Sequence, residues 1–69
     1  MSREIAPYIS VDPAIRAGKP VIAGTRVPVD VVVGKLAGGM AVTEVADEYD
    51  LSVDAVLAAL RYATNRPNM

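Results

Sequence analysis

The sequence predicts a mainly α fold, in which three helices that include a helix-turn-helix follow a short N-terminal β-hairpin. Two patterns indicate this fold. Apolar residues recur at the spacing of a helix in three successive segments of residues 28–64, which predicts a three-helix bundle. In residues 8–27, two short segments rich in β-branched residues are separated by turn-forming residues, which predicts a β-ribbon. With only 69 residues, the chain is expected to form a single domain, residues 1–69.

The ribbon is expected to contain two short strands, at residues 9–11 and 21–23. Between them, Asp12 is suited to cap a single helical turn, and Pro13 to occupy its first position, where a missing N–H does no harm. Gly18 is expected to close that turn in a left-handed conformation. Because an isolated two-stranded ribbon is unstable in water, the ribbon must pack on the helices or pair with another chain.

The limits of the helices are indicated by residues that commonly start or stop them. Pro28 fits the start of the first helix, and the pair Gly38-Gly39 fits its end. Thr43 is predicted to cap the second helix, and Ser52 the third. The expected inner faces carry Val29, Val32, Val33, Leu36 and Met40 in the first helix, Val42, Val45, Ala46 and Tyr49 in the second, and Val53, Val56, Leu57 and Leu60 in the third.

Residues 42–63 have the spacing of a helix-turn-helix of the winged-helix or homeodomain-like kind. Two short helices joined by a tight turn cross steeply, so a small residue is needed where they approach, and Ala46 supplies it. Asp50 occupies the turn position that favours glycine, and Asp is among the residues that tolerate a left-handed conformation there. The alternative is two ordinary packed helices without this geometry.

The third helix lacks the side chains with which such a motif usually reads DNA. Base edges are read by Arg, Lys, Asn or Gln near the start of the second helix of the motif. The outward positions expected here are Ser52, Val53, Asp54, Leu57, Ala58 and Arg61. This surface suits contact with a protein, so a dimer or partner interface is expected at Val53, Leu57, Ala58, Arg61 and the tail residue Arg66. Alternatively, Leu57 and Ala58 complete the core.

The composition favours self-association. The chain has no Cys and no His, which excludes disulfides and nearly excludes a zinc site, and no cofactor is expected. Domains of this size then commonly depend on a partner chain, and 52% of the residues are hydrophobic, so we expect at least a homodimer. Because the sequence has neither a long apolar run nor the pattern of a signal peptide, no membrane contact and a cytoplasmic location are expected.

Positive charge is concentrated in the first half of the chain. Residues 1–35 carry five basic and three acidic side chains, a net charge of +2, whereas residues 36–69 carry two basic and five acidic side chains, a net charge of −3. Any DNA contact should therefore come from the first half, because DNA-binding surfaces are basic. The candidate residues are Arg16, Lys19, Thr25 and Arg26, which lie on turns around the ribbon and can bind phosphate oxygens. Alternatively, Arg26 pairs with Asp30 and the other cations are solvated.

One segment resembles a known family. The run GKPVIAGTRVPV at residues 18–29, followed by a helix, a Gly-Met corner and a helix-turn-helix, resembles domain-of-unknown-function family four hundred and thirty-three and is similar to VapB-type antitoxins. The resemblance covers residues 8 to about 63 and implies a three-helix, DNA-binding-like fold. It also implies a partner toxin, commonly a PIN-type ribonuclease that holds Mg²⁺ with acidic residues. The protein is then expected to neutralise that toxin and to bind operator DNA as an autorepressor.

No catalytic arrangement is evident in the sequence. The three Ser residues have no evident base, and no phosphate-cradling glycine loop precedes a helix at the required spacing, so we expect no enzyme activity. A second class of function remains open: a protein-interaction or dimerisation module that keeps the fold but no longer binds DNA. The acidic second half supports this alternative.

Overall fold

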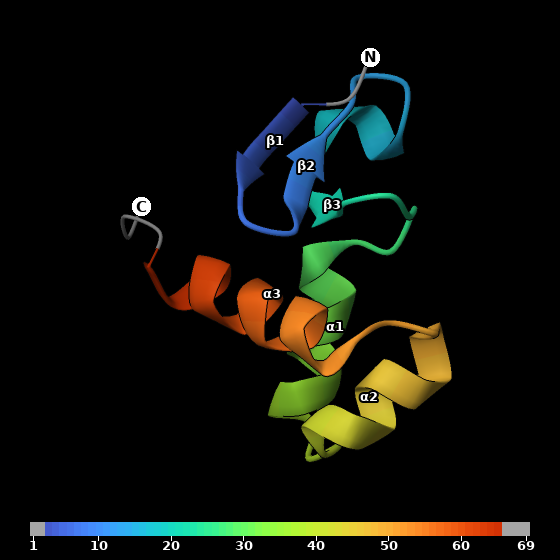
Figure 1. Ribbon diagram of the computed structural model, residues 1–69, viewed down its shortest axis with the longest axis vertical. Helices are drawn as coiled ribbons and strands as arrows, with labels where there is room; N and C mark the ends of the chain where they lie inside the picture. Colours follow the sequence, from blue (N-terminus) through green and yellow to red (C-terminus); the bar gives the residue numbers. More distant parts are fainter. Residues whose placement is uncertain (1–2, 66–69) are drawn as a thin grey trace.

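The computed structural model describes residues 3–65, which form three helices and a small antiparallel sheet (Figure 1). The elements in chain order are β1 (Arg3–Ala6), β2 (Ile9–Val11), the short 3₁₀ turn η1 (Arg16–Gly18), β3 (Val21–Ile22), α1 (Val29–Ala37), α2 (Val42–Tyr49) and α3 (Val53–Asn65). The sheet lies at one end of the molecule and α2 at the other, with α1 and α3 between them. No helix within residues 3–65 is long and apolar enough to cross a lipid bilayer.

The sheet has three strands in the order β1-β2-β3, where the sequence predicted a two-stranded hairpin. The predicted pairing of β2 with β3 is confirmed, with Ile9 opposite Ile22. Strand β1 was missed because it buries almost nothing: its first three residues, residues 3–5, are exposed, and only Ala6 is half-buried. An edge strand of this kind carries no alternation of apolar and polar residues from which it could be recognised.

The connection between β2 and β3 differs from the helical turn that was predicted. The Asp12 carboxylate accepts a hydrogen bond from the backbone N–H of Ala14 (2.9 Å), and the N–H of Ile15 donates to the carbonyl of Asp12 (2.8 Å). Asp12 therefore stabilises a tight turn and does not cap a helix. Gly18 has the predicted left-handed conformation, with φ of 81°.

The predicted ends of the helices are confirmed at three of four positions. Gly39 follows α1 with φ of 106°, a conformation that glycine adopts without steric cost. The Ser52 hydroxyl accepts a hydrogen bond from the N–H of Ala55 (3.1 Å) at the start of α3. Thr43 does not cap α2. The helix begins two residues earlier than expected, with Ala41 at its N-cap, and the Glu44 carboxylate reaches back to the N–H of Ala41 (2.8 Å).

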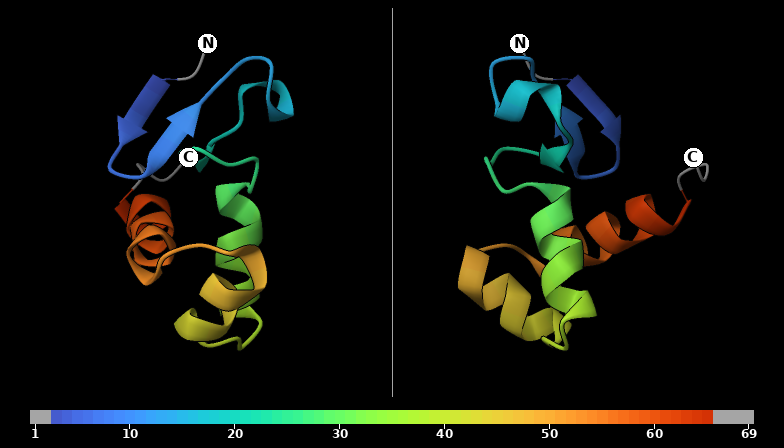
Figure 2. Two further views of the ribbon diagram at one scale, coloured as in Figure 1. Left: turned by 45° about the vertical axis from the view of Figure 1, so that its right-hand side comes forward. Right: turned by 180° about the vertical axis from the view of Figure 1, so that it is seen from behind.

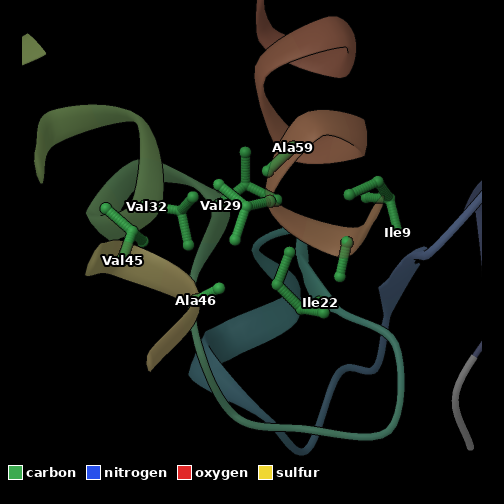
Figure 3. Packing of buried hydrophobic residues seen from close by; sticks show 9 residues of the cluster. Ile9, Ile22, Val29, Val32, Val45, Ala46 and Ala59 are labelled. Atoms are coloured by element: carbon green, nitrogen blue, oxygen red, sulfur yellow. The ribbon is translucent and has the colours of Figure 1, made fainter. Parts of the chain in front are cut away.

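One hydrophobic cluster joins the sheet to all three helices (Figure 3). Its buried members are Ile9, Ile22, Val29, Val32, Val45, Ala46, Ala55, Val56 and Ala59. The predicted inner faces of α1 and α2 supply their share of this cluster. Helix α3 is rotated relative to its predicted inner face, because Ala55 and Ala59 are buried while Val53 and Leu57 are exposed, as their place among the predicted outward positions requires. Alanines fit there since α3 packs closely against α1, α2 and β2.

The turn between α2 and α3 contains the predicted left-handed residue, Asp50, with φ of 56°. The N–H of Leu51 donates to the carbonyl of Ala46 (2.8 Å) and closes the end of α2. We expect Asp50→Gly to raise the free energy of unfolding by about 1 kcal/mol, because glycine avoids the steric cost of this conformation. Asp50→Ala is the matched control and should lower it, as urea denaturation of the two variants can show. Equal stability of both variants would contradict the assignment of strain to Asp50.

Candidate nucleic-acid interface

Two turns of the N-terminal half lie next to each other on one side of the sheet. Figures 1 and 2 show η1 and the turn that follows β3 on the same side of the molecule in each view. An open pocket of about 500 Å³ separates the turn at Asp12 from the turn that follows β3. It is lined by Ser10, Asp12, Ile15, Val21, Gly24, Thr25 and Arg26.

The turn after β3 is held rigidly by its own hydrogen bonds. The Thr25 hydroxyl donates to the carbonyl of Ile22 (2.7 Å) and accepts from the N–H of Val27 (3.0 Å). Ladder-like bonds flank it, from the N–H of Ile22 to the carbonyl of Val27 (2.9 Å) and from the N–H of Val29 to the carbonyl of Pro20 (3.1 Å). The hydrogen of the Thr25 hydroxyl is therefore used inside the turn, which gives Thr25 a structural role beside its predicted one.

We expect Thr25→Val to lower the free energy of unfolding by about 1–3 kcal/mol, since the change leaves the Val27 N–H without its acceptor. Thr25→Ser keeps the hydroxyl and should cost much less. The measurement is thermal or urea unfolding followed by circular dichroism. If the valine and serine variants lose the same stability, the two hydrogen bonds do not hold the turn.

The basic residues predicted to bind DNA are all exposed to solvent. Arg16, Lys19 and Arg26 are exposed, and Arg26 also lines the pocket. Arg16 has a left-handed backbone with φ of 55°, which is uncommon for a residue other than glycine. In the described part of the chain no ion pair joins Arg26 to Asp30, so the predicted alternative for Arg26 is not found.

Asp12 is a member of this site that sequence reasoning missed. The N–H of Ala14 holds the pKa of the Asp12 carboxyl below its usual value of 3.8, and the charge of Arg26 lowers it further. Asp12 is therefore a carboxylate at neutral pH, and it offsets part of the positive charge around the pocket. Its place beside Pro13 identified a turn, but nothing in the sequence indicated that the turn faces Arg26.

Some of the residues of the predicted protein interface on α3 are exposed, and one is not. Val53 and Leu57 are 41% and 37% exposed, and Arg61 is exposed as well. Ala58 is only 3% exposed, so it belongs to the interior and not to the interface. The rotation of α3 that buries its alanines explains this correction. Arg66 lies outside the described residues.

The site offers no arrangement for a bound metal ion. Within residues 3–65 there is no group of three or more His, Cys, Asp or Glu side chains that could hold one. The site consists of exposed basic side chains on two backbone turns, with one carboxylate beside them. Such groups can bind anionic oxygens and form hydrogen bonds.

Comparison with known proteins identifies a similar solved structure and a matching family model. The crystal structure of Rv2018 from Mycobacterium tuberculosis is similar, with a TM-score of 0.69 and 36% sequence identity, over 75% of this chain and 24% of that chain. The chain thus spans about a quarter of the length of Rv2018. No curated protein matches the chain. The model of the family described as Protein of unknown function (DUF433) matches residues 9–63. Because this match takes in both turns of the site and most of the three helices, the chain belongs to that family.

Proposed function

We propose that the protein is a non-enzymatic, antitoxin-like regulator of a type II toxin-antitoxin system. It acts in the cytoplasm as a homodimer, binds operator DNA as an autorepressor and neutralises a PIN-type ribonuclease. The single observation that carries the proposal is the structure of residues 18–29, the segment that resembles the family. Its hydrogen bonds hold a turn that lies on the same side of the molecule as η1 (Figure 2), and Arg16, Lys19 and Arg26 in these two segments are exposed.

Helices α2 and α3 fit a helix-turn-helix of the winged-helix or homeodomain-like kind, at residues 42–63. They are short, pack against each other and are joined by three residues, 50–52. Ala46 is buried where the predicted small residue was needed, and Asp50 has the left-handed conformation of the turn position. These features support the motif as a scaffold for the DNA-binding form.

The DNA contact is assigned to the basic turns in preference to α3. Asp54 is exposed in the first turn of α3, where it would meet phosphates unfavourably. Near the cations of the two turns, the acidic residue that lines the pocket is Asp12. In a homodimer the three cations become six, which is a typical number of phosphate contacts for a small DNA-binding protein.

The toxin contact is assigned to the tail, where Arg66 belongs to the predicted interface set. The other exposed members of that set, Val53, Leu57 and Arg61, lie on α3. An arginine can pair in a bidentate manner with the carboxylates of a Mg²⁺-binding nuclease centre. The affinity of the purified toxin for this chain, measured by calorimetry with and without residues 66–69, tests this part of the proposal.

Binding to the promoter region of the protein's own gene tests the DNA part. Fluorescence anisotropy of a labelled promoter fragment should show binding at low micromolar protein or tighter, and the affinity should fall steeply with salt. An unrelated fragment of equal length is the control. No salt-sensitive binding, with or without the toxin, would rule out the autorepressor.

A protein-interaction or dimerisation module without DNA binding is the second candidate, and one observation favours it. The second half of the chain has a strongly acidic surface, with exposed carboxylates at Glu44, Asp47, Glu48, Asp50 and Asp54. Such a surface repels DNA and attracts a basic partner. The two candidates are separated by the anisotropy titration, because only the regulator binds the promoter.

A further inference from the structure

We propose that the solvent-facing side of α3 is a homodimer interface, on which α3 of a second copy packs in the antiparallel direction about a two-fold axis. The inference rests on the proposed function for its biological role, since that function includes a homodimer with no defined surface. Its evidence is independent of DNA and toxin, and comes from the way α3 distributes its side chains between the core and solvent.

Helix α3 buries three alanines together with Val56 and leaves two larger aliphatic side chains exposed. Ala55, Ala58 and Ala59 are 4%, 3% and 0% exposed, whereas Val53 and Leu57 are 41% and 37% exposed. A helix that only had to cover the core would bury Leu57 and expose its alanines. The reversed order means that the outer face of α3 carries apolar area that the rest of the described chain does not cover.

Helical geometry shows how this outer face is organised. At 100° per residue, the buried positions of α3 span an arc of about 160°, and Leu57 lies opposite the middle of that arc. Val53 and the half-buried Leu60 lie on one side of Leu57. Asp54 and Arg61 lie on its other side and are exposed. The face therefore has an aliphatic edge, a leucine at its centre and a charged edge.

The two charges on this edge have opposite signs and a regular spacing. Asp54 and Arg61 are seven residues apart, which is two helical turns, or about 10.5 Å along the axis. Within residues 3–65, neither side chain has a recorded ion pair. Their midpoint along α3 lies next to Leu57, at the centre of the face.

A two-fold axis through this midpoint makes the face complementary to itself. In the antiparallel arrangement, Asp54 meets Arg61 of the second copy, and the same pair forms again on the other side of the axis. Leu57 then meets its own symmetry mate, and Val53 meets Leu60 of the second copy. A parallel two-fold arrangement would instead set the charged edge of each copy against the aliphatic edge of the other, which leaves Asp54 and Arg61 without an opposite charge. The charges thus favour a second copy and one direction of packing.

Reversing either charge should break the dimer. We expect sedimentation of the full chain, without DNA, to show a dimer for the parent protein and at least about tenfold weaker association for Asp54→Arg and for Arg61→Asp, because each change sets like charges opposite each other twice. Asp47→Arg, on the exposed side of α2, is the matched control for the added charge and should leave association unchanged.

Mixing the two variants gives a sharper result that unfolding cannot imitate. An equimolar mixture of D54R and R61D restores both opposite-charge pairs, so it should form a heterodimer about as strong as the parent dimer, although each variant alone is weakened. The doubly substituted chain D54R/R61D should also associate again with itself.

Three outcomes would overturn the inference. The first is a parent protein that stays monomeric well above micromolar concentration, which would leave the face to a different protein such as the toxin. The second is a D54R protein that dimerises as strongly as the parent. The third is a mixture that fails to associate although both variants are folded by circular dichroism. Since no DNA is present, these results are separate from the failure of the proposed DNA binding.

Discussion

Replacing Arg16, Lys19 and Arg26 together with alanine is expected to weaken binding to the promoter fragment on the order of a thousandfold at low salt, if the dimer makes six phosphate contacts. Each phosphate contact releases about 0.9 counterion from the DNA, so six contacts give a slope near −5 for the logarithm of affinity against the logarithm of salt concentration. The variant should lose both the affinity and the slope. Anisotropy titrations at several salt concentrations measure the two quantities together.

The control for this triple variant is Lys35→Ala, at the end of α1, where an exposed cation lies outside the two turns. It should leave the slope close to that of the parent, because Lys35 is not among the cations assigned to the phosphate contacts. All three replaced residues of the triple variant are exposed, so its fold and stability should remain close to those of the parent. A triple variant that retains the parent slope would place the DNA contact elsewhere in the chain.

The features that the sequence predicted well depend on short-range physics. Gly39, Asp50 and Ser52 end or begin helices through the conformation or side chain of one residue and the backbone within one turn. The same holds for the turn at Asp12, whose hydrogen bond to Ala14 spans two residues. Even there, the sequence indicated that the chain turns but not which kind of turn forms, because a capping Asp and an Asp in a turn use the same carboxylate.

The features that were missed depend on contacts between distant segments. Strand β1 exists because its backbone pairs with β2, while its side chains remain largely exposed. The rotation of α3 follows from close packing against α1, α2 and β2, which favours Ala55 and Ala59 over the larger Leu57. In the candidate site, the placement of Asp12 beside Arg26 is likewise a result of the tertiary fold. A pattern of residues along the chain contains none of this information.

Replacing Ile9 with alanine is expected to lower the free energy of unfolding by about 2–5 kcal/mol, the usual cost of removing a buried isoleucine and leaving a cavity. Ile9 is 0% exposed, pairs with Ile22 across the sheet and belongs to the cluster that includes Val32 and Val56 of the helices. It thus links the sheet to the helical part. A domain of this length is stabilised by only about 3–10 kcal/mol in total, so the variant should be unfolded in large part at physiological temperature.

Ile5→Ala provides a control with the same chemical change in the same sheet. Ile5 lies on β1 and is 39% exposed, so its removal should cost well under half as much as that of Ile9. Urea denaturation of both variants at one fixed protein concentration measures the difference, because dissociation of a dimer would otherwise contribute to the apparent stability. If the two variants lost equal stability, the sheet and helices would not share one core. In that case the turns on either side of β3 would depend only on their own hydrogen bonds, and Ile9→Ala would retain promoter binding.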